Sequence, residues 1–197
     1  IIPVYNVEAY IEECLASVVA QSDAKANIEC IIVDDCSPDG SMDIVRRFVD
    51  NYQGAVQFRT LRHEVNRGIS AARNTGVEAA TGDYVFFIDS DDYLMEHGLK
   101  TLVDGLLANP DADVVQGNSL NLGKEVYSKR QEPIVLLSKK ERLGALVNTI
   151  FPVTPWNRLI RRNVLIDNHI YFVEGIIFED NPWSYQLMDV AQKVLVL

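Results

Sequence analysis

The feature that most constrains the fold of this chain is a regular alternation of short apolar runs with segments of helical periodicity. In the first half, the apolar runs Ile28–Val33, Val56–Leu61 and Tyr84–Ile88 are each bounded by polar turn residues. This alternation is typical of an α/β fold in which a central, mostly parallel sheet is flanked by helices. Helices are expected around Ile11–Val18, Ile44–Val49, Ile69–Ala80, Leu99–Leu107 and Ser138–Ile150, with further strands at Ile1–Ile2 and Asp113–Gln116.

Local signals at the ends of these segments support the assignment. Asn6 is expected to be the N-cap of the first helix, because a short polar side chain there can accept a backbone hydrogen bond. Ser138 and Glu141 have the spacing of a capping box at the start of the last expected helix. Residues 118–137 are polar and irregular, and they predict a hairpin or a loop.

Charge and composition exclude several classes of protein. The chain has 18 Lys and Arg against 28 Asp and Glu, a formal charge of −10, which argues against a basic surface that binds nucleic acid. With 48% apolar residues among 197, the chain can form one substantial core, and we expect a single domain, 1–197. No apolar run approaches the length of a membrane span.

Three cysteines, Cys14, Cys30 and Cys36, form no CxxC pair, and the expectation is reduced thiols in a cytoplasmic protein rather than disulfides or a zinc site. The sequence opens on Ile1 without a methionine and closes on the apolar run Val194–Leu197. We therefore expect it to be cut at both ends.

Acidic residues follow two of the expected strands directly. Val33 leads into Asp34 and Asp35, and Ile88 leads into the segment Asp89–Asp92. The carboxyl ends of parallel strands form the usual ligand crevice of open α/β sheets. Carboxylates gathered there would repel one another unless a cation such as Mg²⁺ or Mn²⁺ lay among them. A solvated turn or a helix cap is the alternative for either acidic cluster.

A glycine-bearing loop, Asn66–Gly68, opens the helix expected at Ile69–Ala80. Free backbone N–H groups at a helix N-terminus favour phosphate, and Arg67 and Arg73 add positive charge nearby. Plain turn geometry with ion-paired surface arginines is the alternative.

Taken together, several motifs spread over most of the chain resemble one known family. They are Ile2–Asn6, Val33–Ser41, Asn66–Gly76, Gly82–Asp92, Pro155–Leu159 and Phe178–Asp180. In order and spacing they resemble family 2 of the inverting, nucleotide-sugar-dependent glycosyltransferases, whose Rossmann-like fold is called GT-A. The resemblance implies a nucleotide-sugar-binding half, 1–117, and a smaller acceptor-binding half, 118–197, incomplete at its C-terminus.

The resemblance also assigns roles on the nucleotide side. Pro3, Val4 and Tyr5 would hold the nucleotide base together with Asp35, which would accept from a uracil ring nitrogen if the donor is a UDP-sugar. Arg73 would lie beside the nucleotide and its phosphates.

Further roles follow from the same family for the acidic segment. Asp89 and Ser90 would face the ribose or sugar, and Asp91 would bind a Mn²⁺ or Mg²⁺ ion that bridges the diphosphate. Such an ion would neutralise charge on the leaving group, so metal binding would be catalytic.

On the acceptor side, the resemblance assigns a catalytic role to one carboxylate. By resemblance, Asp180 would be the base that takes the proton of the attacking hydroxyl. Its place before an apolar helical segment leaves helix capping as the alternative. Trp156 and Trp183 are expected to pack in the core or to stack on a sugar. No role is assigned to His63, His97 or His169.

The function implied is transfer of a sugar from a nucleotide-sugar to a saccharide or lipid-linked saccharide acceptor with inversion, in polysaccharide biosynthesis. The expected location is the cytoplasm, with peripheral membrane association through a missing C-terminal region. The alternatives are a nucleotidyltransferase that makes a nucleotide-sugar and a non-catalytic nucleotide-sugar-binding domain.

Overall fold

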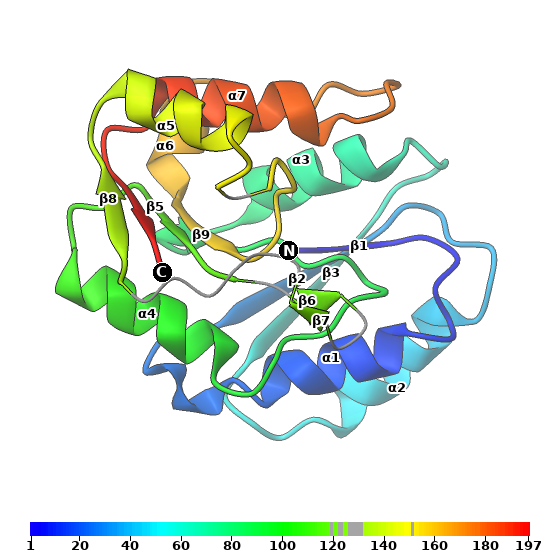
Figure 1. Ribbon diagram of the computed structural model, residues 1–197. Helices are drawn as coiled ribbons and strands as arrows, with labels where there is room; N and C mark the ends of the chain where they lie inside the picture. Colours follow the sequence, from blue (N-terminus) through cyan, green and yellow to red (C-terminus); the bar gives the residue numbers. More distant parts are fainter. Residues whose placement is uncertain (119, 122–123, 126–131, 151) are drawn as a thin grey trace.

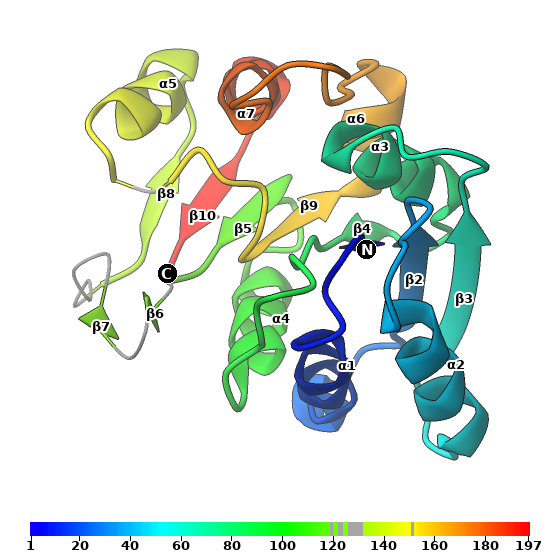
Figure 2. The same cartoon turned by 90° about the vertical axis from the view of Figure 1, so that its right-hand side faces the viewer.

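The computed structural model describes residues 1–118, 120–121, 124–125, 132–150 and 152–197. Figure 1 shows a sheet between two layers of helices, and Figure 2 shows the same layers from the side. In chain order the elements are β1 (Ile2–Val4), α1 (Ile11–Val19), η1 (Ser22–Ala24), β2 (Glu29–Asp34), α2 (Ser41–Asn51), β3 (Gln57–Arg62), α3 (Ile69–Ala79), β4 (Tyr84–Val85), α4 (Gly98–Ala108), β5 (Val114–Gln116), β6 (Leu120–Asn121), β7 (Lys124–Glu125), β8 (Ile134–Leu136), α5 (Lys139–Val147), β9 (Arg158–Arg161), α6 (Arg162–Asp167), α7 (Asp180–Val190) and β10 (Val194–Val196).

The first half of the chain builds a parallel sheet with the order β1-β2-β3. The segment that follows β4 lies on the other side of β1, because the Ile1 nitrogen donates to the Phe86 carbonyl at 2.8 Å and the Ile88 N–H donates to the Ile1 carbonyl at 3.1 Å. The carboxyl ends of β1, β2 and residues 86–88 therefore meet at one edge of the sheet, as the strand pattern predicts.

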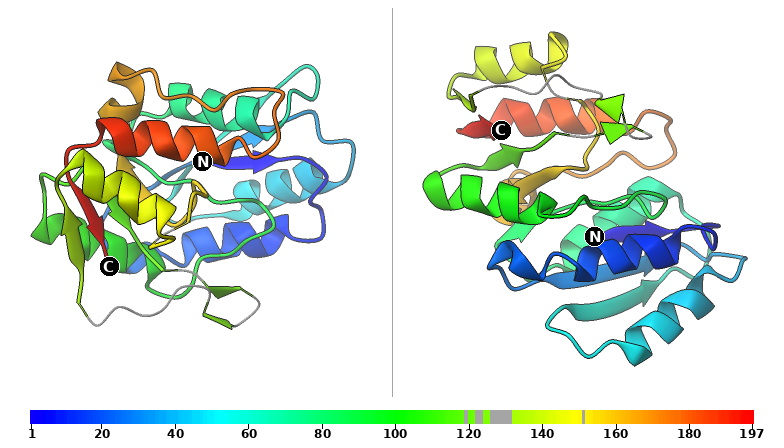
Figure 3. Two further views of the ribbon diagram at one scale, coloured as in Figure 1. Left: turned by 45° about the horizontal axis from the view of Figure 1, so that its top comes forward. Right: turned by 60° about the horizontal axis from the view of Figure 1, so that its bottom comes forward.

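The second half adds a mixed sheet with the order β4-β9-β5-β10-β8. In this sheet β10 pairs with β5 in parallel, whereas β9 and β8 are antiparallel to their neighbours. Figure 3 shows that the N-terminus lies in the middle of the fold, next to β1, and that the C-terminus lies at the end of β10. The α/β fold expected from the sequence is confirmed, with its parallel part confined largely to the residues before 117.

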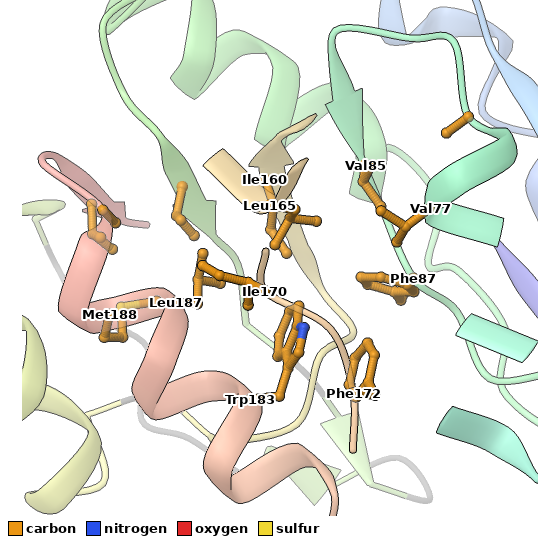
Figure 4. Close-up of a cluster of buried hydrophobic side chains, with 14 of the residues drawn as sticks. Val77, Val85, Phe87, Ile160, Leu165, Ile170, Phe172, Trp183, Leu187 and Met188 are labelled. Atoms are coloured by element: carbon orange, nitrogen blue, oxygen red, sulfur yellow. The ribbon is translucent and has the colours of Figure 1, made fainter. Parts of the chain in front are cut away.

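Of the three apolar clusters among the described residues, two lie on opposite faces of the parallel sheet. Ile32 packs with α1 and α2, whereas Ile31 and Val33 pack with the helices of the other layer. On that second face Trp183 is 1% exposed and stacks on Phe172 with ring centroids 4.5 Å apart (Figure 4). Trp183 is therefore a core residue, while Trp156 is half-buried.

Three local expectations have different outcomes. The capping box of Ser138 and Glu141 is present at the start of α5. The prediction for Asn6 is wrong: α1 begins at Ile11, its N-cap position is Tyr10, and Asn6 has a left-handed backbone with φ 57°. Between 118 and 137, β6 and β7 form an antiparallel pair, and residues 119, 122–123 and 126–131 lie outside the described residues.

Candidate functional site

The residues expected to bind a nucleotide lie along the carboxyl edge of the parallel sheet. Pro3 and Val4 are buried in β1, and Tyr5 follows them with 48% of its surface exposed. Asp35 comes directly after β2, and its N–H donates to the Val4 carbonyl at 2.9 Å. The turn after β1 and the end of β2 are thus adjacent, as required for residues that share one ligand.

Asp35 is 2% exposed and is engaged by three donors from the chain itself. Its Oδ1 accepts from the Arg67 N–H at 2.8 Å and from His63 Nδ1 at 2.7 Å, and its Oδ2 accepts from the Gly68 N–H at 2.7 Å. Because the carboxylate lies at the N-terminus of α3, it takes the place of the anion that such a terminus favours. The Arg67 and Gly68 N–H groups are therefore engaged within the chain, and the binding of phosphate at this loop stays a prediction.

His63 is a functional candidate that the sequence analysis missed. Its ring is 8% exposed and bridges two groups, with Nε2 lying 2.9 Å from the Thr75 hydroxyl oxygen and Nδ1 on Asp35. A histidine oriented in this way fixes the rotamer of its carboxylate partner. The available signal was its position directly after β3, at the same edge of the sheet as Asp35.

The loop after β1 and the loop after β2 are joined by a group of hydrogen bonds centred on Asp39. Its carboxylate accepts from the Glu8 N–H at 2.9 Å, from the Ser41 hydroxyl at 2.6 Å and from the Ser37 hydroxyl at 2.7 Å. Burial alone would raise the pKa of Asp39, but these hydrogen bonds, led by those from Ser41 and Ser37, lower the pKa to about 2. Both loops that carry the expected base-binding residues are thereby fixed together.

The acidic segment Asp89–Asp92 forms a turn beyond residue 88, closed by the Asp92 N–H donating to the Asp89 carbonyl at 3.0 Å. Ser90 is 5% exposed. Desolvation and the charges of Asp89 and Asp91 raise the pKa of Asp92, so the segment concentrates negative charge. Throughout the described part of the chain, no group of three metal-ligating side chains is assembled. A hard cation here would therefore take further oxygens from a diphosphate, which is how Mg²⁺ is commonly held.

Arg73 lies beneath this segment rather than on the surface. It is 3% exposed and donates from Nη2 to Asp89 Oδ1 at 2.7 Å and from Nη1 to Glu179 Oε1 at 2.8 Å. Asp89 and Glu179 therefore lie on either side of one guanidinium, which brings the acidic segment next to the start of α7.

Asp180 is the first residue of α7, and Glu179 occupies the N-cap position without a capping hydrogen bond from its side chain. The capping alternative thus does not describe Asp180. Burial lowers the pKa of Arg158 to about 9, against the opposing effect of the Asp180 charge, so these two groups lie within electrostatic reach of one another. The preceding segment exposes four apolar side chains, Val173, Ile176, Ile177 and Phe178.

Comparisons with known proteins identify the family. Residues 1–168 match the family model described as "Glycosyl transferase family 2". The chain is 32% identical over 197 residues to the uncharacterized glycosyltransferase YibD of Escherichia coli (strain K12), with 95% of this chain and 55% of that protein covered. It is 30% identical over 204 residues to the poly(ribitol-phosphate) beta-N-acetylglucosaminyltransferase TarS of Staphylococcus aureus (strain MW2), with 100% and 33% covered.

The fold comparison agrees with the sequence comparison. The crystal structure of S. aureus TarS 1–349 in complex with UDP-GlcNAc superposes with a TM-score of 0.83 at 28% identity, covering 100% of this chain and 54% of that one. The chain spans little more than half of the length of YibD, as it does of TarS 1–349. The family match, the sequence identities and the shared fold together establish that the chain belongs to glycosyl transferase family 2.

Proposed function

We propose that the chain is the catalytic part of a glycosyltransferase that moves a sugar from a nucleoside diphosphate sugar to an acceptor hydroxyl. The observation that carries this proposal is the single guanidinium of Arg73 between Asp89 and Glu179. It brings a charged segment suited to a diphosphate beside a carboxylate, Asp180, suited to a base. Membership of family 2 and the UDP-GlcNAc complex of the related TarS support the same chemistry.

On the donor side we assign Pro3, Val4, Tyr5 and Asp35 to the nucleotide base. A carboxylate accepts about four hydrogen bonds, and Asp35 already accepts three from the chain. One remaining acceptor position suits a ring N–H such as that of uracil, whereas cytosine presents an acceptor at the equivalent ring nitrogen. A UDP-sugar is therefore the favoured donor, with Asp89 and Ser90 facing its ribose or sugar.

The acidic segment fits a Mn²⁺ or Mg²⁺ ion held by Asp91, because one turn carries the carboxylates of Asp89, Asp91 and Asp92 and a cation would neutralise their mutual repulsion. Such an ion would supply Lewis-acid neutralisation of the departing diphosphate. Asp91 is exposed and can reach a ligand in solvent, whereas the Asp89 carboxylate is already paired with Arg73.

Asp180 is assigned the role of general base. As the acceptor hydroxyl attacks the anomeric carbon from the face opposite the diphosphate, the Asp180 carboxylate receives its proton. A single displacement of this kind inverts the anomeric configuration. An NMR spectrum of the product that retains the donor's configuration would contradict the assignment.

Two other functions are less well supported. A nucleotidyltransferase would want a glycine-rich loop with Lys or Arg after the first strand, and Pro3–Asn6 contains none of these residues. A non-catalytic binding domain would have no need of both Asp91 and Asp180. Turnover of a nucleoside triphosphate with a sugar phosphate would favour the first of these, and donor binding without any turnover would favour the second.

We assign donor binding to residues 1–117 and acceptor binding to residues 118–197, and we propose that the acceptor is a saccharide or lipid-linked saccharide of a cell-surface polysaccharide. The name of TarS, which acts on poly(ribitol-phosphate), supports an acceptor of this general class. Within the described residues, the helices are too short or too polar to cross a bilayer. A cytoplasmic location at the inner face of a membrane remains part of the proposal.

The first experiment is a thermal-shift screen of nucleotide-sugars with and without manganese. A bound ligand raises the melting temperature by mass action. We expect UDP and UDP-sugars to raise it in the presence of manganese and to do so far more than ADP or CDP. Equal shifts for all nucleotides, or none for UDP, would contradict the proposed donor.

A further inference from the structure

Two arginine–glutamate bridges connect the region around α3 to the segment that leads into α7, and they differ in burial. Arg67 lies 3.0 Å from Glu174 at the surface, where the side chains are 48% and 44% exposed. Arg73 lies 2.8 Å from Glu179 in the interior, where they are 3% and 16% exposed. Exposed ion pairs contribute little, whereas loss of one partner of a buried pair leaves an uncompensated charge. The inner bridge is therefore the one able to fix the two segments.

The guanidinium of Arg73 is enclosed by chain atoms on each side. Its two terminal nitrogens donate to Asp89 and Glu179, and the ring of Phe172 lies 5.1 Å from its Cζ atom. Its Nε has no hydrogen-bond partner among the described residues. At 3% exposure, a diphosphate could contact this group only after one of the two carboxylates had moved away.

The start of α7 is attached to Arg73 in two ways. Glu179 sits at the N-cap but directs its carboxylate to Arg73 instead of capping its own helix. Phe172, under the guanidinium, stacks on Trp183 in the first turn of α7 with an angle of 8° between the rings (Figure 4). Asp180 lies between these two attachments in the sequence, so its backbone is held with respect to Asp89.

We propose that Arg73 is a positioning residue that sets the distance between the acidic segment and Asp180, and that it is not a ligand of the donor phosphates. The proposal rests on the proposed function, in which Asp180 is the base and the acidic segment holds the donor. A reaction between a bound donor and an activated hydroxyl depends steeply on the separation of the groups that hold them. Arg73 acts on the rate through that separation and not through contact with substrate.

The test is Arg73→Lys, which keeps a positive charge but has a single nitrogen that cannot span both carboxylates as a guanidinium does. We expect kcat to fall at least tenfold, while KM for the donor and the Kd for UDP stay within threefold of the wild type. Amide hydrogen exchange in residues 184–188, the first residues whose N–H groups donate within α7, should become at least tenfold faster. Arg46→Lys, which alters the exposed pair of Arg46 with Asp43 on α2, is the control and should leave all of these values unchanged.

A second variant guards against misfolding of the first. Glu179→Gln keeps the bond between Arg73 and Asp89 and weakens only the attachment of α7, so it should lower kcat and leave UDP affinity intact. If Arg73→Lys lost UDP affinity while its kcat stayed unchanged, the proposal would be overturned, because Arg73 would then act as a phosphate ligand. Unchanged exchange in residues 184–188 of Arg73→Lys would overturn it as well. If the wild type binds no UDP, the proposed function fails, and the exchange experiment still decides whether Arg73 holds α7.

Discussion

The two sides of the proposed site differ in how far their side chains are buried and hydrogen-bonded to other residues of the chain. On the donor side, Asp35 is 2% exposed and accepts three hydrogen bonds, and Asp39 fixes two loops together. Before Asp180, by contrast, Ile177 is 81% exposed and Phe178 is 70% exposed. The donor side is therefore preorganised by hydrogen bonds of the chain itself, whereas the acceptor side presents apolar surface to its surroundings.

The largest effect is expected on the acceptor side of this comparison, at the base. Asp180→Asn should lower the transfer rate by about 10²–10⁴-fold, because the amide cannot take the proton of the hydroxyl. UDP affinity should be unchanged, since the donor side is built from other residues. Steady-state kinetics and calorimetry measure the two effects separately.

The matched control is Asp189→Asn, on the same helix and paired with Lys139 at the surface. It should leave the transfer rate unchanged. Turnover of Asp180→Asn close to that of the wild type would mean that another group is the base.

The next largest effect is expected on the preorganised side. In Asp35→Asn, an amide N–H₂ takes the place of one oxygen and faces backbone N–H donors at the start of α3. The free energy of unfolding should fall by about 2 kcal/mol, the cost of buried donors left without acceptors. Urea denaturation against the exposed control Asp50→Asn measures this, and a fall no larger than in the control would show that the carboxylate is not needed to close the loop.

The group of hydrogen bonds centred on Asp39 predicts that the free energy of unfolding depends on pH. Because its pKa is lowered from 3.8 to about 2 in the folded protein, Asp39 contributes stability that is fully present above pH 4 and is lost as the pH falls toward 2. Urea denaturation between pH 5 and pH 2 should give a flatter curve for Asp39→Asn than for the wild type or for the exposed control Asp167→Asn. Curves of equal slope for Asp39→Asn and the wild type would show that these hydrogen bonds do not stabilise the folded protein.

The smallest effect is expected at the exposed apolar surface. Ile177→Ser should change the free energy of unfolding by less than about 0.5 kcal/mol, as is usual for surface substitutions. The same substitution in the core, Ile160→Ser, should cost more than about 3 kcal/mol, because Ile160 is fully buried. A large cost at Ile177 would mean that this surface is packed in solution, and the contrast between the two sides would then be lost.

Local patterns explain why much of the fold could be predicted. The apolar runs that become β2 and the segment 84–88, the acids directly after them and the capping box of α5 depend on neighbours within a few residues. The acids fall at one sheet edge because parallel strands place their carboxyl ends together. The prediction for Asn6 is wrong because this residue, although of a type that caps helices well, occupies a left-handed loop position, and α1 starts at Ile11 without a side-chain cap.

The hydrogen bonds and ion pairs of the site could not be predicted in the same way, because they join residues far apart in the sequence. Arg73 and Glu179 are separated by 106 positions, and Asp35 and Gly68 by 33. No periodicity distinguishes an arginine that binds phosphate from one buried between two carboxylates. For the same reason, His63 carried no signal beyond its position after a strand.

The measurement that tests the central claim most directly is a calorimetric titration of UDP in the presence of Mn²⁺, repeated with Asp91→Ala and with a chelator. If the acidic segment holds a diphosphate through a divalent cation, UDP should bind the wild type and lose at least tenfold in affinity in both of the other conditions. Equal UDP affinity in all three conditions would contradict the account.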